Sequence, residues 1–253
     1  MCAGDLHTVT AQDFEGFIEP FRKIELASDE SGAIAELIVE EGQFVEQGQP
    51  MARMDDRLQK IQLKIAKQVL ESVSQLEVAR EGYDKRIAIK QKLAQLRQEG
   101  HASESELIRA DMELSIAKGR YLAAQEETIV RELEQERAAV QLQRRTITAP
   151  INGVVTKIHR RQGEYLSPVN PDLLTLIQID QLIAKFNIPA ELANSFEVGK
   201  AYSLHLNNDK TVLAVVYSIS VEVDAESETV EVKMVIDNSG YQIRSGEKIS
   251  LSI

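Results

Sequence analysis

Few residues in this 253-residue sequence have the types and spacing that catalysis or metal binding requires. The single cysteine, Cys2, lies in no catalytic-looking sequence, although a histidine distant in the chain is an open alternative as its partner. Met51 and Met54 are close together, but such a pair at the end of a strand is more typical of a core than of a copper site. The histidines are scattered without the spacing of metal ligands; they are His7, His101, His159 and His205. We therefore predict no metal, no cofactor and no catalytic centre.

Composition and charge exclude a further class of function. The formal net charge is −11, with 43% hydrophobic and 27% charged residues. The longest runs of Lys and Arg are the pairs Arg144-Arg145 and Arg160-Arg161. Because nucleic-acid binding needs a concentrated positive face, we do not expect nucleic acid as a partner.

A long stretch from about Asp55 to Arg145 is predicted to form two antiparallel helices. Apolar residues recur in its first arm at steps of three and four, which is typical of a coiled-coil seam: Leu58, Ile61, Ile65, Val69, Val73, Leu76, Ala79, Tyr83 and Ile87. The second arm repeats this rhythm at Leu107, Ala110, Leu114, Ala117, Tyr121, Ala124 and Thr128, then less regularly at Leu133, Val140 and Leu142. Between the arms, Gly100 suits a left-handed residue after a helix, and Ser103 with Glu106 forms a capping-box pattern.

Each arm contains one interior glycine, Gly82 and Gly119, which costs about 1 kcal/mol relative to alanine. Folding the stretch about its turn brings these glycines to nearly the same level, beside Tyr83 and Tyr121. We therefore hypothesise a notch, packed by the two tyrosine rings, where the helices approach closely or bend.

Short runs of β-forming residues, separated by glycines, lie on both sides of the helical stretch. Gly32 and Gly42 are ten residues apart before it, and Gly153 and Gly163 are ten residues apart after it. This repeated spacing predicts one β-fold whose two halves are separated by the inserted helices.

The glycine-punctuated halves resemble those of a lipoyl or biotinyl carrier domain, in which a modified lysine lies on the turn between the halves. Here the segment Met51 to Asp56 runs directly into the first helix, so the coiled coil replaces that turn. Lys60 is the nearest lysine, and helical periodicity explains it better than a swinging arm does. Cofactor carriage is therefore not expected.

A lipoyl-like fold split by a helical hairpin and followed by a β-barrel resembles the periplasmic adaptor subunits, or membrane fusion proteins (HlyD/RND-type), of efflux pumps and type I secretion systems. The segment Ile183 to Glu191 is similar to the strand and short helix that open the barrel of this family, and Val198-Gly199-Lys200 follows at a turn. Alternation from Thr229 to Ile236 and from Ile249 to Ile253 also predicts half-buried strands. The resemblance covers about Val9 to Ile253.

These observations predict an α+β fold: a split lipoyl/biotinyl-like β-sandwich, an inserted long antiparallel α-helical hairpin and a C-terminal β-barrel domain. The predicted parts are a tail with the first barrel strand (1–16), the first lipoyl-like half (17–54), the hairpin (55–146), the second half (147–181) and the barrel (182–253). Many family members continue into a membrane-proximal domain, whereas this sequence ends where the barrel closes. Transporter docking is therefore expected to use a smaller surface or another polypeptide.

The resemblance implies a non-catalytic adaptor that links an inner-membrane transporter (RND or ABC type) to an outer-membrane channel of the TolC type. At the hairpin tip, efflux adaptors carry an Arg, a Leu four residues later and a Ser seven residues after that, which contact the channel. Here the corresponding residues are Lys92, Leu96 and Ser103, and lysine lacks the bidentate fork of arginine. Self-association into a ring-like oligomer is also implied, and exposed apolar residues off the seam, such as Val78, Ile89 and Ile129, would favour it.

Localisation is open at the level of sequence. No stretch approaches the roughly 18 apolar residues of a membrane span, and the first residues lack the regions of a signal peptide. The start Met1-Cys2-Ala3-Gly4 nevertheless resembles a matured lipoprotein, which makes Cys2 a candidate lipid-attachment residue; the alternative is a free thiol on a tail. The adaptor interpretation implies the periplasm, at the inner membrane. The rival hypothesis is a cytoplasmic coiled-coil scaffold or carrier-like protein with a lipoyl-type fold.

Overall fold

The computed structural model describes residues 12–71, 74–206 and 210–253. The chain forms two compact units: a β-body, made by the chain up to Ala52 and from Ile147 onward, and a helical hairpin, Arg53–Thr146. The three long helices lie in the hairpin and the sheets lie in the β-body, so the predicted α+β class is confirmed. Among the described residues, no helix has an apolar stretch long enough to span a membrane.

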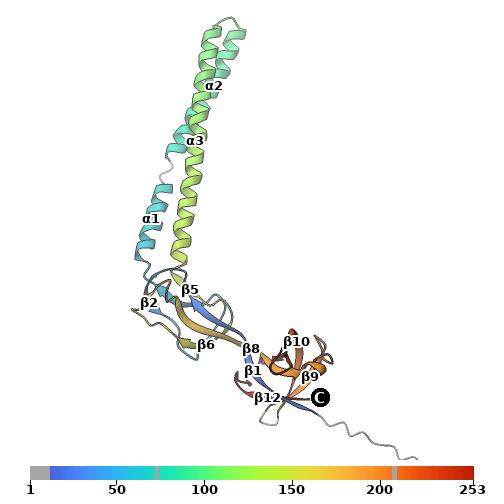
Figure 1. Cartoon of the computed structure of the whole chain (residues 1–253). Coiled ribbons are helices and arrows are strands. Elements are labelled where there is room, and N and C mark those ends of the chain that lie inside the picture. The colour runs from blue at the N-terminus through green and yellow to red at the C-terminus, as the bar shows by residue number, and fades with distance from the viewer. Residues whose placement is uncertain (1–11, 72–73, 207–209) are drawn as a thin grey trace, which may run out of the picture. The chain divides into compact units, whose positions relative to one another are not determined.

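The hairpin consists of α1 (Arg57–Glu71), α2 (Ser74–Gln98) and α3 (Glu104–Gln143). In Figure 1, α1 and α2 follow each other along one arm, and α3 runs back beside both. The described parts of the first arm are helical throughout, and residues 72–73 between α1 and α2 lie outside the described residues. Val73, one of the predicted seam residues, lies outside the described residues.

Contacts between α2 and α3 follow the predicted seam. The α3 residues predicted there, from Leu107 to Thr128, are half-buried, and Ala110 is buried. The rings of Tyr83 and Tyr121 stack with their centroids 5.7 Å apart and an interplanar angle of 8°. Farther along α3, the prediction fails for Leu133 and Val140, whose side chains are exposed.

The predicted seam of α1 is wrong. Four residues assigned to it are 41–61% exposed, and they are Leu58, Ile61, Ile65 and Val69. The half-buried positions are instead Gln59, Leu63, Ala66 and Leu70. At the base of the hairpin, the Met54 amide donates to the Arg145 carbonyl (2.8 Å), and the Gln59 side-chain amide lies 2.8 Å from the Arg145 guanidinium. These contacts fix which side of α1 faces α3, so its apolar stripe points to solvent.

The first part of the β-body is a sandwich of two halves related by internal symmetry. One half contains β2 (Gly32–Leu37), β3 (Phe44–Val45) and β4 (Pro50–Met54), and the other contains β5 (Thr146–Thr148), β6 (Gly153–Ile158) and β7 (Tyr165–Leu166). The Gly42 amide donates to the Val155 carbonyl (2.7 Å), and the Gly163 amide donates to the Ile34 carbonyl (2.9 Å). Both turn glycines have positive φ, 85° and 88°. Each half therefore secures a strand of the other, as the repeated glycine spacing predicted.

The second part of the β-body is a closed barrel. Its strands are β1 (Asp13–Ala27), β8 (Asp172–Pro189), β9 (Ala201–Leu206), β10 (Thr211–Asp224), β11 (Thr229–Asp237) and β12 (Lys248–Ser252), with the short helix α4 (Ala190–Ala193) after β8. Among the described residues they pair in the order β1-β12-β9-β10-β11-β8, and β8 returns to β1. The core between them includes Phe14, Ile18 and Phe186, whereas Phe17 is exposed.

Strands β1 and β8 connect the barrel to the sandwich, because they pair from Gly16↔Phe186 in the barrel to Ala27↔Asp172 (Figure 1). Where they leave the barrel, buried Asn238 holds the chain that follows β11. Its side-chain amide donates to the carbonyls of Ile179 (2.8 Å) and Ile243 (3.1 Å) and accepts from the Ile243 amide (3.0 Å).

Candidate functional site

The turn at the hairpin tip begins with a helix end of the Schellman type. The His101 amide donates to the Leu96 carbonyl (2.8 Å), and the Gly100 amide donates to the Arg97 carbonyl (3.0 Å). Gly100 has a φ of 78°, which only glycine adopts without strain. The predicted role of Gly100 is confirmed, and these bonds fix the direction in which the chain leaves α2.

The predicted capping box starts α3. The Ser103 hydroxyl accepts from the Glu106 amide (3.3 Å), and the Glu106 carboxylate accepts from the Ser103 amide (2.8 Å). The bond from the Ser103 backbone amide, followed by the bond from its hydroxyl, lowers the pKa of Glu106 below its usual value of 4.5. Two otherwise unpaired amides at the start of α3 thus find partners within the turn itself.

The three residues predicted to contact a channel lie on the two sides of this turn. Lys92 is exposed on α2, and Leu96, one helical turn later, is half-buried. Ser103 is exposed, although its hydroxyl is engaged in the cap of α3. Leu96 contributes to the turn through its carbonyl, which accepts from His101. The tip therefore presents a cation and an apolar side chain on the last turns of α2, and a hydroxyl at the start of α3, on either side of a turn held by hydrogen bonds.

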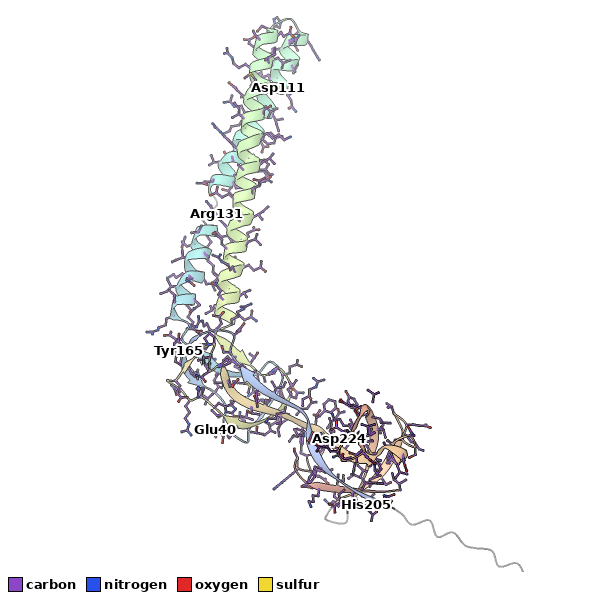
Figure 2. All side chains as sticks on the ribbon, viewed as in Figure 1. Glu40, Asp111, Arg131, Tyr165, His205 and Asp224 are labelled. Atoms are coloured by element: carbon purple, nitrogen blue, oxygen red, sulfur yellow. The ribbon has the colours of Figure 1, made fainter. Side chains whose placement is uncertain are left out.

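Ion pairs that the sequence patterns did not predict join the arms below the tip. Arg97 pairs with Glu104 (3.6 Å), Lys90 with Asp111, and Arg86 with Glu113 (2.5 Å). Figure 2 labels Asp111 in the half of the hairpin nearest the tip and Arg131 farther from it. In each pair, the basic residue before Gly100 and the acidic residue after it are nearly the same number of positions from Gly100. This pattern in the sequence could have predicted the pairs. All are partly exposed, so each contributes little by itself but helps fix the register of the arms.

Of the notch hypothesised at the two interior glycines, the packing of the Tyr83 and Tyr121 rings is confirmed, whereas the close approach of the helices is wrong. At Gly82 and at Gly119, no described atom beyond the neighbouring helix backbone lies within 4 Å of the position that a Cβ would take. Gly82 instead lines an open groove between α2 and α3, with a volume of about 630 Å³. Its other lining residues are Gln75, Val78, Ala79, Arg86, Glu113, Ile116, Ala117 and Arg120. The absence of a side chain at residue 82 deepens a surface depression rather than drawing the helices together.

Removing the Ser103 hydroxyl should loosen the tip without unfolding the hairpin. In Ser103→Ala, we expect a loss of about 1 kcal/mol of local stability, because the cap of α3 is lost. Amide hydrogen exchange in the first turn of α3 should accelerate about fivefold. Ser115→Ala, an exposed serine within α3, is the matched control and should not change exchange at the tip.

The same cap should respond to acid. Because the pKa of Glu106 is lowered in the folded state, its stabilising contribution is full above the usual value of 4.5 and is lost as the pH falls through the folded value. Exchange in the first turn of α3, corrected for intrinsic rates, should therefore rise below about pH 4.5 in the wild type. In Glu106→Gln that dependence should be weaker, and an unchanged pH profile would contradict the role of the carboxylate.

Two remaining predictions concern lipid attachment and metal binding. Cys2, the candidate lipid-attachment residue, lies outside the described residues. In the described ranges, no group of three or more His, Cys, Asp or Glu side chains is arranged to hold a metal ion.

Solved structures that are similar over most of the chain identify the fold. MacA from Actinobacillus actinomycetemcomitans matches with a TM-score of 0.79 and 22% identity, covering 96% of this chain and 78% of that one. A MacA-MexA chimera carrying the Pseudomonas aeruginosa MexA α-hairpin matches with a TM-score of 0.62 and 18% identity, covering 96% and 81%. The membrane fusion protein Spr0693 from Streptococcus pneumoniae R6 also matches, with a TM-score of 0.62 and 15% identity, covering 94% and 96%. At these identities the likeness shows the fold alone.

The family is shown by sequence. No curated protein sequence matches the chain. However, the family model described as RND MFP, barrel-sandwich hybrid domain, matches residues 22–181, which is more than half of the chain. That range contains both sandwich halves and the whole hairpin between them. The chain therefore belongs to the RND membrane fusion proteins.

Proposed function

We propose that this protein is a non-catalytic periplasmic adaptor that links an inner-membrane transporter to an outer-membrane channel. Its role is geometric: several copies associate side by side, the hairpin tips contact the channel and the barrels contact the transporter. Membership in the RND membrane fusion proteins supports this proposal most directly. A neighbour in structure, EmrA, is itself described as a periplasmic adaptor protein.

The hairpin tip supports the channel-binding part of the proposal. The hairpin end is held by a Schellman turn, a capping box and three ion pairs, so its end residues are presented in one geometry. Preorganisation of this kind lowers the entropic cost of binding. The proposed contact residues are Lys92, which would face an acceptor on the channel, Leu96 and Ser103. Since the Ser103 hydroxyl already accepts from Glu106, it would offer the channel only its remaining hydrogen-bonding capacity.

Exposed apolar side chains support self-association. Val78, Ile89 and Ile129 are 43–70% exposed, and the outward stripe of α1 adds more apolar surface. A neighbouring copy packed beside the hairpin would cover exposed apolar side chains of this kind. The proposed oligomer is a ring, in which every copy makes the same contacts with its neighbours.

Photo-crosslinking from the tip tests the proposal. A photoreactive residue replaces Leu96 in the complete protein in cells of the source bacterium, and the captured protein is identified. We expect capture of an outer-membrane channel, with a lower yield when Lys92→Glu is added, because the charge at the contact is reversed. A photoreactive residue at Val130, exposed but far along α3 from the tip, is the control and should not capture the channel. Capture of only a cytoplasmic protein from residue 96 would instead support the coiled-coil scaffold.

A further inference from the structure

We propose that the groove at Gly82 binds the Leu122 side chain from α3 of a second copy, so that neighbouring hairpins associate through two different surfaces. This inference rests on the self-association in the proposed function and specifies its contact. Four observations carry it: the groove, an apolar stripe elsewhere on α3, the matching level of the two, and the opposite charges of the arms.

The groove is an apolar depression with a charged rim. Val78 is 70% exposed on one side of it, and Ile116 is 56% exposed on the other. Ala79, Gly82 and Ala117 form the floor with small or absent side chains, and the Arg86–Glu113 ion pair lies at one end. Its volume of about 630 Å³ is large enough for a leucine side chain with the helix surface around it. Farther from the tip, a second groove between the arms has a mixed lining of Gln62, Ile65, Ala66, Val69, Glu134, Arg137, Ala138 and Gln141.

The surface that fits the groove lies on another side of α3. Leu122, 46% exposed, follows the groove residues Ile116 and Ala117 by six and five positions. At 100° per residue, this spacing places Leu122 about half a turn around the helix from the groove. Ile108 and Ile129, both more than half exposed, are separated from Leu122 by whole heptads and continue the same stripe.

Leu122 and the groove lie at the same level along the hairpin. Glu113 pairs with Arg86, and the ring of Tyr121 stacks on that of Tyr83, so this part of α3 lies beside the groove segment of α2. If a second copy is generated by rotation about an axis parallel to the hairpins, each of its residues lies at the same height along that axis as in the first copy. A second copy generated by such a rotation therefore brings its Leu122 to the groove of the first. A two-fold axis between neighbours would instead bring groove against groove.

Charge favours the same arrangement. Helices α1 and α2 together contain ten Lys and Arg and four Asp and Glu. Helix α3 contains five Lys and Arg and nine Asp and Glu. Contact through unlike surfaces places the basic arm of one copy beside the acidic α3 of the next, whereas contact between identical arms would place like charges together. Electrostatic complementarity therefore selects a second copy as the occupant and sets its orientation.

A disulfide-trapping experiment tests the contact. Cysteines replace Val78 and Leu122 in the complete protein, expressed in cells as the adaptor. Cys2 is kept in every variant because it is the candidate lipid-attachment residue, and the wild type, whose single cysteine is Cys2, gives the background cross-linking. Under mild oxidation, the double variant Val78→Cys/Leu122→Cys should give a ladder of covalent oligomers. Either single variant should remain largely monomeric. Residue 78 of one copy lies beside residue 122 of the next, so a cysteine at only one of these positions has no engineered cysteine beside it. Val78→Cys/Ala123→Cys is the matched control, since Ala123 is exposed at the same level but about 100° around α3.

Three results would overturn the proposal. They are efficient dimers of Val78→Cys alone, equal cross-linking of the Ala123 control, and no oligomers of the double variant. As a second readout, Gly82→Leu would fill the groove and should reduce the ladder at least fivefold while the hairpin remains helical. Channel capture from residue 96 is measured in parallel: if it persists while the ladder is absent, only the Gly82 contact is wrong, and if it too is lost, the adaptor function fails.

Discussion

Alanine at Gly153 should destabilise the β-body by about 3 kcal/mol or more, although only one methyl group is added. A Cβ at this position would overlap the Ile177 carbonyl oxygen and lie 3.0 Å from its carbon. Val154 pairs with Ile177 on β8, so relief would require β6 to move away from the strand that carries much of the core. The change is measured as a lower urea midpoint by circular dichroism and as faster amide exchange in β6 and β8.

Gly119→Ala is the matched control for this prediction. Gly119 is exposed within α3, and no described atom beyond the neighbouring helix backbone lies within 4 Å of its would-be Cβ. The same substitution should therefore stabilise the hairpin by up to about 1 kcal/mol, through helix propensity. If Gly153→Ala were as stable as the wild type, the close approach of β6 and β8 would be contradicted.

Aspartate at Asn238 should have the second large effect, a loss of about 3 kcal/mol with almost no change in shape. Asn238 is 3% exposed, and its amide nitrogen donates to the carbonyls of Ile179 and Ile243. A carboxylate retains the acceptor for the Ile243 amide but places an anionic oxygen against both carbonyls. The charge is costly because it is buried and because the new oxygen faces two acceptors with no donor. Because Ile179 lies on β8 where β8 leaves the barrel, amide exchange should increase there and in residues 238–243.

Asn170→Asp is the control for the Asn238 substitution, because Asn170 is exposed in a turn and its backbone makes the turn's hydrogen bonds. Its stability should change by less than about 0.5 kcal/mol. A loss at Asn238 no larger than this would show that the hydrogen bonds around it contribute little to the barrel.

The sequence predicted the fold well where a structural feature depends on residues at a regular spacing or only a few positions apart in the chain. The ten-residue spacing of Gly32 with Gly42 and of Gly153 with Gly163 predicted the two halves, whose turn glycines donate to equivalent carbonyls. The tip was equally predictable, since Gly100 and Ser103 act through residues at most five positions away. Whether that tip contacts a channel is a proposal, because neither the fold nor the family model tests individual residues.

What could not be predicted depends on distant partners. Helix α1 has apolar residues at helical spacing on two of its sides, and contacts with Arg145, far along the chain, decide which side faces α3. The crowding at Gly153 comes from Ile177 on another strand. At Gly82 the sequence correctly marked an unusual position, but the same residue is compatible with a close contact or an open depression.

The pairing of β1 with β12, from Asp13↔Ser252 to Phe17↔Lys248, also determines when this protein can fold. The first barrel strand remains without one of its neighbours until β12, far along the chain, has emerged from the ribosome. The hairpin makes mostly local contacts and can form much earlier. During synthesis, the growing chain would therefore carry a finished hairpin on an incomplete barrel whose edges are exposed to aggregation. Disruption of β12 should thus lower the yield of folded protein by more than the loss of the contacts of this short strand suggests.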